Sequence, residues 1–460
     1  MLFTNRDLKK LIFPLIIEQL LSISVGMFDT MMISSLGESA VSGVSLVDML
    51  NVLMINIFSA LATGGAVVCA HELGQAKACD GAGHADHAAD ARSRARSAAK
   101  QLLLVLLVAS VGIAALAFIA RRGLLRLCFG AIEDDAMGYA VTYFEISAIS
   151  YPFIAIYNGL AALFRTMGNS TVTMVVSLIL NLLNIGGNAL LIYGLEWGVA
   201  GAAIASAISR FAGMLMLLVV IASKKQVLYI DWRERFRPQL ATIKRILRIG
   251  LPNSLENSVF QLGRILVLSM IAGFGTIQTA ANAVANNIDA MGVIPGQAMG
   301  LAMVTVVGQC IGAGDYKAAR QYERKLMGFA YGSLAVTNLT IIAGLPLILK
   351  LYDLSEETLA LATTLILLHT GFGILMWAPS FVLPNALRAA QDVRFTMVTS
   401  IFSMVAFRIA LTWVIGVQME MGIVGVWIAM LVDWLFRATC FWLRIKTGKW
   451  LSNVQRENVA

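Results

Sequence analysis

The sequence predicts an all-α, polytopic membrane protein whose twelve transmembrane helices form two pseudo-symmetric six-helix bundles around a central cleft. Two observations favour this fold class. Hydrophobic residues make up 58% of the 460 residues and charged residues only 13%, which is about half of the charged share in soluble domains. The second half of the chain also repeats motifs of the first, as two bundles of the same topology require.

Apolar segments long enough to cross a bilayer recur along the whole chain. They are expected at residues 11–35, 42–70, 99–120, 138–164, 170–194, 198–222, 246–272, 280–310, 326–350, 361–387, 395–416 and 422–443. The first run is too long for a signal peptide, so we interpret it as an uncleaved helix. Four prolines within these segments are expected to kink them: Pro152, Pro295, Pro379 and Pro384.

The positions of Lys and Arg predict how the chain crosses the membrane. The formal net charge is +8, but the basic residues lie in alternate loops, so nucleic acid is not expected as a partner. The predicted outer loops hold only Arg121, Arg122, Arg126 and Lys350. By the positive-inside rule, both termini are predicted to be cytoplasmic.

Internal repeats divide the chain. Glu18 recurs as Glu256, 238 positions later, and Arg165 recurs as Arg388, 223 positions later. The residues by which the offsets differ are expected in the Ala-rich segment 80–98, which we interpret as a cytosolic loop. Two halves with six helices each have the same topology, as in carriers that work by alternating access. The predicted domains are an N-lobe at 1–222, a linker at 223–245, a C-lobe at 246–443 and a cytosolic tail at 444–460.

Two carboxylates occupy the first predicted helix, Glu18 and Asp29. A charge at the centre of a spanning helix costs roughly 2.5–3.5 kcal/mol, so such residues usually face an aqueous cavity or a partner. Asp29 has no acidic counterpart, because the repeat aligns it with Val267. A carboxylate used by one lobe fits coupling to an ion or a proton, whereas packing against a neighbouring helix is the structural alternative. Glu18 and Glu256 have the further alternative of symmetric structural caps, with Arg264 as a partner for Glu256.

Polar residues in other predicted helices suggest further sites. Asn184 and Asn188 share one helix face and could offer amide oxygens to a hard cation, or hydrogen bonds to a neighbouring helix. Asp48 and Asp289 lie near the outer ends of the second helices, as cation-collecting or simply solvated groups. Arg210, Arg264 and Arg408 lie inside spans and are interpreted as structural. The candidates for a substrate cleft are Glu18, Glu256, Asp48, Asp289 and Asn181.

The sequence lacks the motifs of several other protein classes. The run containing His71, Cys79, His84 and His87 matches no strong zinc pattern, so no metal is expected beyond a Na⁺ at Asp29. No P-loop, nucleotide fingerprint or nucleophile elbow occurs, so we expect no enzyme activity, no cofactor and an ion gradient as the energy source. No disulfide framework is expected from Cys69, Cys79, Cys128, Cys310 and Cys440.

The stretches PLIIEQLLSISVGMFDTMMISSLG and NIGGNALLIYGLEWGVAGAAIAS resemble the multidrug and toxic compound extrusion (MATE) family over almost the full chain. The resemblance implies two six-helix bundles, a V-shaped cleft and exchange of Na⁺ or H⁺ for organic, often cationic, drugs. It implies an N-lobe cation site at Asp29, Asn184, Asn188 and Ser206. Asn188 stands where many members have Asp. Glu256 lies on the predicted seventh helix, about one turn earlier than the acid of the family's NorM-type branch. The acid that this branch carries in helix ten is replaced here near Trp377. No C-lobe ion site is therefore expected.

We thus predict a secondary exporter in a prokaryotic plasma membrane, with a drug or metabolite and the lipid bilayer as its partners, acting as a monomer. The alternative in the same architecture is a flippase for lipid-linked saccharides, although such relatives often carry two more helices and a basic cavity. An intramembrane enzyme is disfavoured, because no nucleophile and base recur at a workable spacing.

Overall fold

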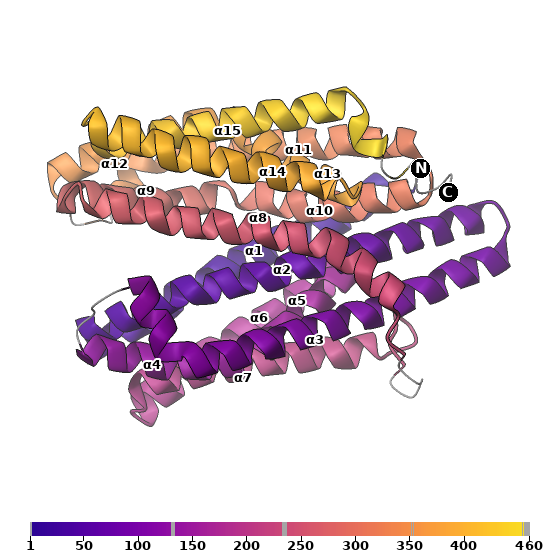
Figure 1. Cartoon of the computed structure of the whole chain (residues 1–460), viewed down its shortest axis with the longest axis horizontal. Helices are drawn as coiled ribbons and strands as arrows, with labels where there is room; N and C mark the ends of the chain where they lie inside the picture. Colours follow the sequence, from indigo (N-terminus) through magenta and orange to yellow (C-terminus); the bar gives the residue numbers. More distant parts are fainter. Residues whose placement is uncertain are drawn as a thin grey trace. The chain divides into compact units, whose positions relative to one another are not determined.

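A computed structural model describes residues 2–129, 134–231, 237–350, 352, 354–452 and 454. These residues form helices and connecting turns, with no strand among them (Figure 1). Eleven helices are long and apolar enough to span a membrane, and a bent helix pair brings the total to as many as twelve. The predicted all-α polytopic fold is thus confirmed.

The chain divides into two compact units, Phe3–Ser254 and a second that begins at Leu255. We call them the N-terminal and the C-terminal unit. The division falls inside a helix, whereas the sequence predicts a linker at 223–245, and residues 232–236 of that linker lie outside the described ranges. The predicted domain boundaries stay a prediction.

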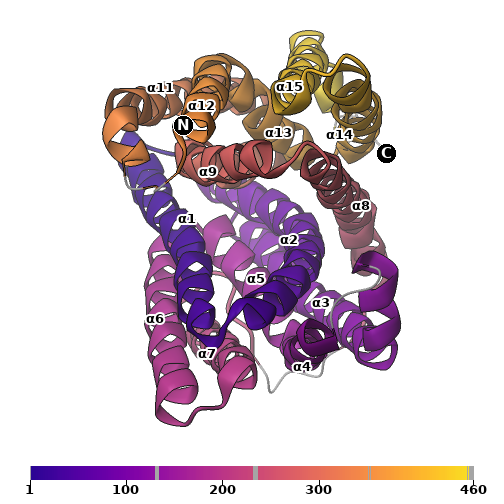
Figure 2. The ribbon, with the colours of Figure 1, turned by 90° about the vertical axis from the view of Figure 1, so that its left-hand side faces the viewer.

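Seven helices and the start of an eighth build the N-terminal unit. They are α1 (Asn5–Ile33), α2 (Glu38–Gly81), α3 (Ala85–Phe129), α4 (Asp134–Ile149), α5 (Tyr151–Thr166), α6 (Ser170–Asn188), α7 (Gly198–Ile221) and α8 (Leu240–Ala272). Helix α1 packs along α6, and the two lie side by side in Figure 2. Pro152 is the second residue of α5, and α4 and α5 meet at a bend of 48°, so the predicted kink is present.

The C-terminal unit contains the rest of α8 and seven further helices. These are α9 (Thr276–Gly292), α10 (Ile294–Gly312), α11 (Tyr316–Leu349), α12 (Glu356–Trp377), α13 (Leu383–Ala389), α14 (Val393–Ser403) and α15 (Gly422–Lys446). Pro295 lies at the start of α10 and separates it from α9 within the predicted span 280–310. Pro379 lies in the π-helical segment Ala378–Val382, and Pro384 begins α13.

Residues 80–98 are not the loop that the sequence analysis expected. Helix α2 continues to Gly81, α3 starts at Ala85, and together they form a long helical hairpin with a short turn (Figure 1). Alanine has the highest helix propensity, and Ala88, Ala91 and Ala95 are fully buried. An Ala-rich segment therefore extends both helices beyond the apolar span instead of ending them.

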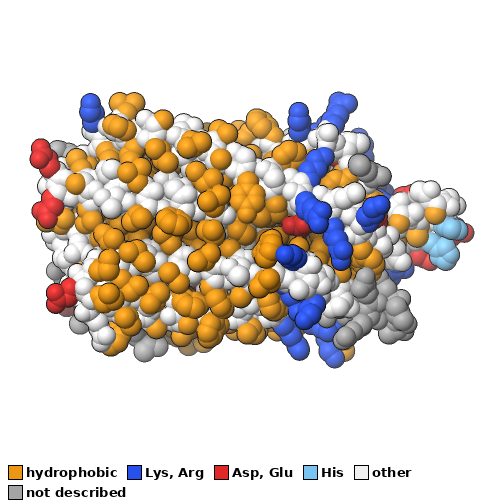
Figure 3. All heavy atoms as spheres, turned by 90° about the horizontal axis from the view of Figure 1, so that it is seen from above, with side chains coloured by type: hydrophobic (Ala, Val, Ile, Leu, Met, Phe, Trp, Pro, Cys, Tyr) orange, Lys and Arg blue, Asp and Glu red, His pale blue; other side chains and the backbone are white. Residues whose placement is uncertain are grey.

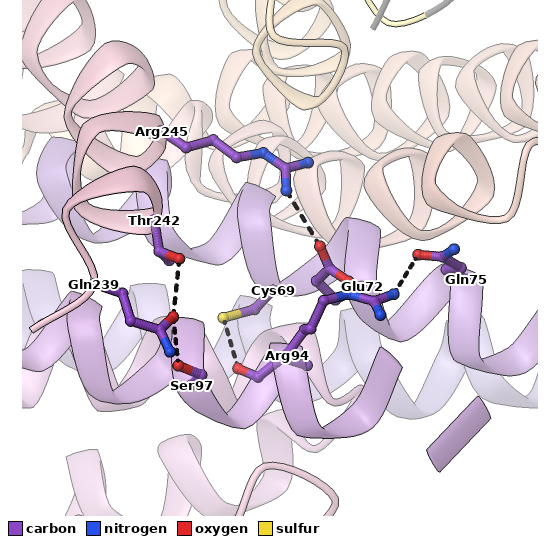
Figure 4. Close-up of polar contacts among 9 residues, drawn as sticks. Cys69, Glu72, Gln75, Arg94, Ser97, Gln239, Thr242 and Arg245 are labelled. Carbon is purple, nitrogen blue, oxygen red and sulfur yellow. Dashed lines mark hydrogen bonds and ion pairs between the residues drawn. The ribbon is translucent and has the colours of Figure 1, made fainter. Parts of the chain in front are cut away.

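Polar contacts fasten the start of α8 to this hairpin (Figure 4). Both Glu72 oxygens on α2 accept hydrogen bonds, one from Arg94 of α3 at 2.8 Å and one from Arg245 of α8 at 3.2 Å. Gln239 accepts from Ser97 at 2.9 Å. The first turns of α8 thereby belong to the N-terminal unit, although the rest of the helix does not.

Side chains of different kinds occupy different parts of the face drawn in Figure 3. Hydrophobic side chains cover most of its length, Lys and Arg gather at one end, and acidic side chains mark the other. This separation agrees with a multi-pass membrane protein whose basic end follows the positive-inside pattern.

Candidate cation and substrate sites

Asp29 meets Asn188 in the N-terminal unit. Asp29 lies one turn before the end of α1, and Asn188 is the last residue of α6, where the helix widens into the π-helical turn Ala189–Gly194. The Asn188 Nδ2 atom donates to Asp29 Oδ1 at 2.5 Å. Such π-helical turns frequently occur at functional sites. The structure therefore brings together two members of the predicted cation site.

Asn184 and Ser206 form the other half of the predicted set. Asn184 Nδ2 donates to Ser206 Oγ of α7 at 3.0 Å. Asn184 and Asn188 are 1% and 0% exposed, and the described structure gives the Oδ1 atom of each no hydrogen-bond donor. Leaving a buried acceptor unsatisfied costs free energy. Two buried amide oxygens of α6 thus have no described donor, and one of the two amides bonds the Asp29 carboxylate.

This donor set fits a monovalent cation or a proton better than a metal that needs several charged ligands. Carboxylate and amide oxygens are hard ligands. Among the described residues, no group of three or more His, Cys, Asp and Glu side chains could hold a metal ion. The site offers Asp29 as its one charged ligand, with Asn184 and Asn188 as neutral ones.

A network that includes Asp48 and Arg210 lies within electrostatic reach of Asp29. The Arg210 guanidinium and the Asp48 carboxylate both act on Asp29. Asp48 accepts a hydrogen bond from Asn51 at 3.2 Å, and Asn51 in turn accepts from the Tyr151 hydroxyl at 3.0 Å. Asp48 is therefore part of a connected network and not an isolated solvated group.

Arg210 and the tyrosines around Asp48 are residues of this network that the sequence analysis missed as site candidates. Tyr143 also hydrogen-bonds Asp48, and Arg210 donates to Ser150 Oγ at 2.7 Å. The signal for Arg210 was its position inside a spanning helix, where a charge needs a counter-charge. The tyrosines carried no such signal, because aromatic residues are common in membrane helices.

Glu18 and Glu256 are buried in ion pairs, which agrees with the structural alternative given for them, and their role as cleft residues stays a prediction. Arg165 donates to Glu18 at 2.8 Å, and Arg388 donates to Glu256 at 2.8 Å. The two arginines are the pair that the repeat aligned. The partner of Glu256 is thus Arg388 and not the predicted Arg264.

Hydroxyl groups complete both ion pairs. Thr173 donates to Glu18 at 2.6 Å, and Ser400 donates to Glu256 at 2.7 Å. The two acids are 7% and 3% exposed. The same buried ion pair therefore holds helices together in each unit, as expected of symmetric structural groups.

Asn181 also serves packing. Its Nδ2 atom donates to the Leu21 carbonyl oxygen of α1 at 2.8 Å. This bond ties the middle of α6 to α1, as the structural interpretation of the helix-five amides expects. Asn181 thus contributes to the support of the Asp29 site, and its place in a substrate cleft stays a prediction.

In the C-terminal unit the buried His369 lies against the partly exposed Asp289. The His369 Nε2 atom lies 2.8 Å from Asp289 Oδ1, and the His369 ring lies between Trp427 and Trp434 at centroid distances of 5.5 Å and 4.8 Å. The sequence analysis missed His369, because one His in an apolar run has no motif. Its partner comes from another helix, which spacing along one helix does not reveal.

Further charges lie in the same unit. Asp433 is fully buried and accepts a short hydrogen bond from Ser403, while Arg437 donates to the Ser380 carbonyl oxygen at 3.2 Å. The Trp377 and Phe381 rings stack with their centroids 5.0 Å apart. Aromatic packing therefore occupies the position that lacks the helix-ten acid.

Comparisons with known proteins agree over most of the chain. A family model described as MatE matches residues 14–190 and 252–414. The chain is 26% identical over 455 residues to a Bacillus subtilis protein named uncharacterized transporter YisQ, covering 97% of this chain and 95% of that protein. It is 25% identical over 456 residues to a Thermotoga maritima protein named probable multidrug resistance protein NorM, covering 97% and 93%.

A solved structure shows the same fold. It is described as the outward-facing conformation of a multidrug resistance MATE family transporter of the MOP superfamily. The TM-score is 0.86 at 20% sequence identity, with 98% of this chain and 96% of that chain covered. The two proteins therefore share their arrangement of helices, although four fifths of the compared residues differ.

Proposed function

We propose that the chain, which belongs to the MatE family, is a secondary antiporter that uses Na⁺ or H⁺ to export organic, often cationic, drugs or metabolites. The family match confirms the resemblance that the sequence indicated. Relatives are named as a transporter and as a probable multidrug resistance protein, which are not names of enzymes. The proposal places a monomer without a cofactor in a prokaryotic plasma membrane, with both termini cytoplasmic.

The observation that supports cation coupling is the environment of Asp29. The Asp29 carboxylate bonds the Asn188 amide, and the buried Oδ1 atoms of Asn188 and of Asn184, one turn earlier on α6, have no described donor. A Na⁺ ion could take these oxygens as ligands, and a proton could instead neutralise Asp29 directly. Either cation removes the negative charge that the Asn188 amide and Arg210 face.

Protonation of Asp29 would weaken the hold of α6 on the outer part of α1, whereas a Na⁺ ion held by oxygens of both helices would replace the Asn188–Asp29 hydrogen bond with its own contacts. The inner part of α1 is fixed separately, because Ser170 donates to the Leu11 carbonyl oxygen at 2.9 Å and Thr173 donates to Glu18. Cation binding would thus bias the packing of one end of a helix whose other end stays in place. Such a two-state element is what alternating access needs, provided that the cation and the substrate favour different states.

The experiment is exchange in proteoliposomes that hold the purified chain and a fluorescent organic cation. A Na⁺ gradient and a pH gradient are imposed separately, and the gradient that drives export identifies the coupling ion. Asp29→Asn is expected to abolish gradient-driven export, whereas Glu38→Gln, which removes an exposed acid at the start of α2, should leave it unchanged. Full coupling in Asp29→Asn would contradict the proposal.

The flippase alternative has less support. The named relatives include multidrug resistance proteins, and the described residues form at most twelve spans, without the two additional helices common in flippases. A fluorescent lipid-linked saccharide in the same liposomes would test it. Its translocation without export of the organic cation would favour the flippase.

A further inference from the structure

We propose that the basic end of the C-terminal unit carries a binding site for a phosphate group, best supplied by the headgroup of an anionic phospholipid. The site is a pocket of about 470 Å³ between the start of α11 and the 3₁₀ helix Lys449–Leu451. Its lining residues are Tyr316, Lys317, Arg320, Gln321, Arg324 and Leu451. This site is separate from the cation site and from every predicted cleft residue.

The described lining residues are rich in hydrogen-bond donors and include no acid. Lys317, Arg320 and Arg324 follow each other at helical spacing, so the three cations point to one face of α11. Gln321 adds an amide and Tyr316 a hydroxyl on the same side. Arginine and lysine at close quarters are the usual protein ligands of phosphate.

The three cations have no carboxylate partner in an ion pair among the described residues. Glu323 acts on Arg324 through its charge, but it is 6% exposed and does not line the pocket. Arg444 of α15 shows the contrast, because it donates to both oxygens of Asp392 at 2.7 Å and 3.1 Å. Three exposed like charges that line one pocket and have no ion-paired carboxylate among the described residues repel one another, and an anion would relieve that repulsion.

The far wall of the pocket is an ordered part of the chain. Trp450 and Leu451 are 0% and 1% exposed, so the 3₁₀ helix is anchored by buried side chains. Gly448 has a φ of 71°, and a side chain there would come within 3.0 Å of Arg320 Nη2. Glycine at position 448 thus allows a close turn beside Arg320. This turn places the 3₁₀ helix next to the basic residues of α11.

The height of the pocket in the membrane identifies the ligand class. The apolar part of α11 is predicted to begin at residue 326, directly after Arg324. The three cations therefore lie at the level of the lipid headgroups, on the basic end that the positive-inside rule assigns to the cytoplasm. Basic pockets at this level bind anionic headgroups, with about 1 kcal/mol, or about a fivefold gain in affinity, for each cation.

The test measures thermal unfolding and lipid retention of the purified full-length chain. The chain is placed in phosphatidylcholine nanodiscs with or without phosphatidylglycerol, and native mass spectrometry counts the lipids that stay bound in detergent. Lys317→Gln/Arg320→Gln/Arg324→Gln is compared with Arg6→Gln/Lys9→Gln/Lys10→Gln, which removes three exposed cations from the start of α1. A third arm adds inorganic phosphate or glycerol phosphate to lipid-free detergent samples.

We expect phosphatidylglycerol to stabilise the wild type and the α1 variant, and the pocket variant to lose this gain together with one retained lipid. Equal lipid retention in all three proteins, or equal loss in both variants, would overturn the proposal. Protection by soluble phosphate alone, lost in the pocket variant, would support the phosphate site and assign it to a soluble ligand. Should the triple variant fail to fold, Arg320→Gln is expected to weaken retention about fivefold.

Discussion

Asn188 is the residue that sets the charge of the proposed cation site. Its amide lies 2.5 Å from Asp29, and the resemblance to the MATE family aligns Asn188 with a position at which many members have Asp. Asn188→Asp would place two carboxylates in contact, and like charges at this distance favour a bound cation or a shared proton. We expect half-maximal export at a lower concentration of the coupling cation, measured by titrating Na⁺ and H⁺ separately in proteoliposomes.

The control for this change is Asn181→Asp. It adds an acid to the same helix, but at a position whose amide bonds the Leu21 carbonyl oxygen and not Asp29. The cation dependence of the control should match the wild type, although its stability should fall with the loss of that bond. An unchanged cation dependence in Asn188→Asp would argue against a cation site at Asp29.

Glu18 and Arg165 permit a test of the structural assignment. Each side chain is largely buried, with 9% and 13% of it exposed, so Glu18→Gln would leave an arginine without its charge partner. Removing one member of a buried pair typically costs about 3–5 kcal/mol. We expect a lower unfolding temperature for Glu18→Gln, and partial recovery in Glu18→Gln/Arg165→Gln.

Glu256→Gln and Glu256→Gln/Arg388→Gln repeat the comparison in the other unit, where the pair has the same length of 2.8 Å. If Glu18→Gln and Glu256→Gln unfold at the wild-type temperature but lose substrate binding, the result would instead support the cleft prediction for the two acids.

The sequence predicted site residues that share one helix face, but it did not predict pairs whose partners lie on different helices. Helical spacing and the repeat singled out Asp29, Asn184 and Asn188, and the structure pairs Asn188 with Asp29 and Asn184 with Ser206. The partner of Glu18 lies 147 positions away, and the partner of His369 lies on another helix. A single sequence contains no signal for such tertiary pairings.

Among the elements, the α2–α3 hairpin shows a limit of hydropathy as a predictor. Residues 80–98 are polar enough to leave the membrane, and leaving the membrane was interpreted as the end of the helix. Helix propensity continued to act outside the apolar span, and Arg92 pairs with Asp80 across the hairpin. Hydropathy locates where a helix crosses the membrane, whereas propensity and capping decide where it ends.

The contact of this hairpin with α8 can be tested through Glu72. Glu72→Gln removes the charge that Arg94 and Arg245 share, and both arginine side chains are partly exposed, at 51% and 37%. The loss should therefore be small, about 1 kcal/mol or less. We expect hydrogen exchange to rise up to about fivefold in the first turns of α8, with little change elsewhere.

Asp90→Asn, an exposed acid of the same hairpin, is the matched control and should leave exchange in α8 unchanged. If exchange in α8 is the same in Glu72→Gln and the wild type, the contacts of Glu72 do not hold the start of that helix.

At the scale of the whole molecule, the repeat was the most informative signal. It divided the twelve spans predicted from hydropathy into two related halves, and the structure confirms the number of spans, with α4 and α5 joined at a bend. It also aligned Arg165 with Arg388, which form matching ion pairs in the two units. The sequence did not predict that the division between the units falls inside α8. Hydropathy shows where a helix begins, but it does not show which other helices that helix contacts.

The contacts of α8 explain this division. A side chain on Gly64 would come within 2.7 Å of the Ile246 carbonyl oxygen, and Asn253 donates to the Ala60 carbonyl oxygen at 3.3 Å. The first turns of α8 thus pack closely on α2. Sequence periodicity alone does not reveal with which unit a shared helix packs.

The predicted orientation of the chain can be tested with Cys79, which is partly exposed near the tip of the hairpin. Cys69 and Cys310 are buried, Cys440 is partly exposed, and the side chain of Cys128 lies outside what the structure describes. A variant that keeps Cys79 alone should react with a membrane-impermeant maleimide in inside-out vesicles and stay unlabelled in intact cells. This result is expected because the hairpin follows the second span and carries the basic residues that the positive-inside rule keeps in the cytoplasm. A chain without cysteines is the background control, and labelling of Cys79 in intact cells would reverse the predicted orientation.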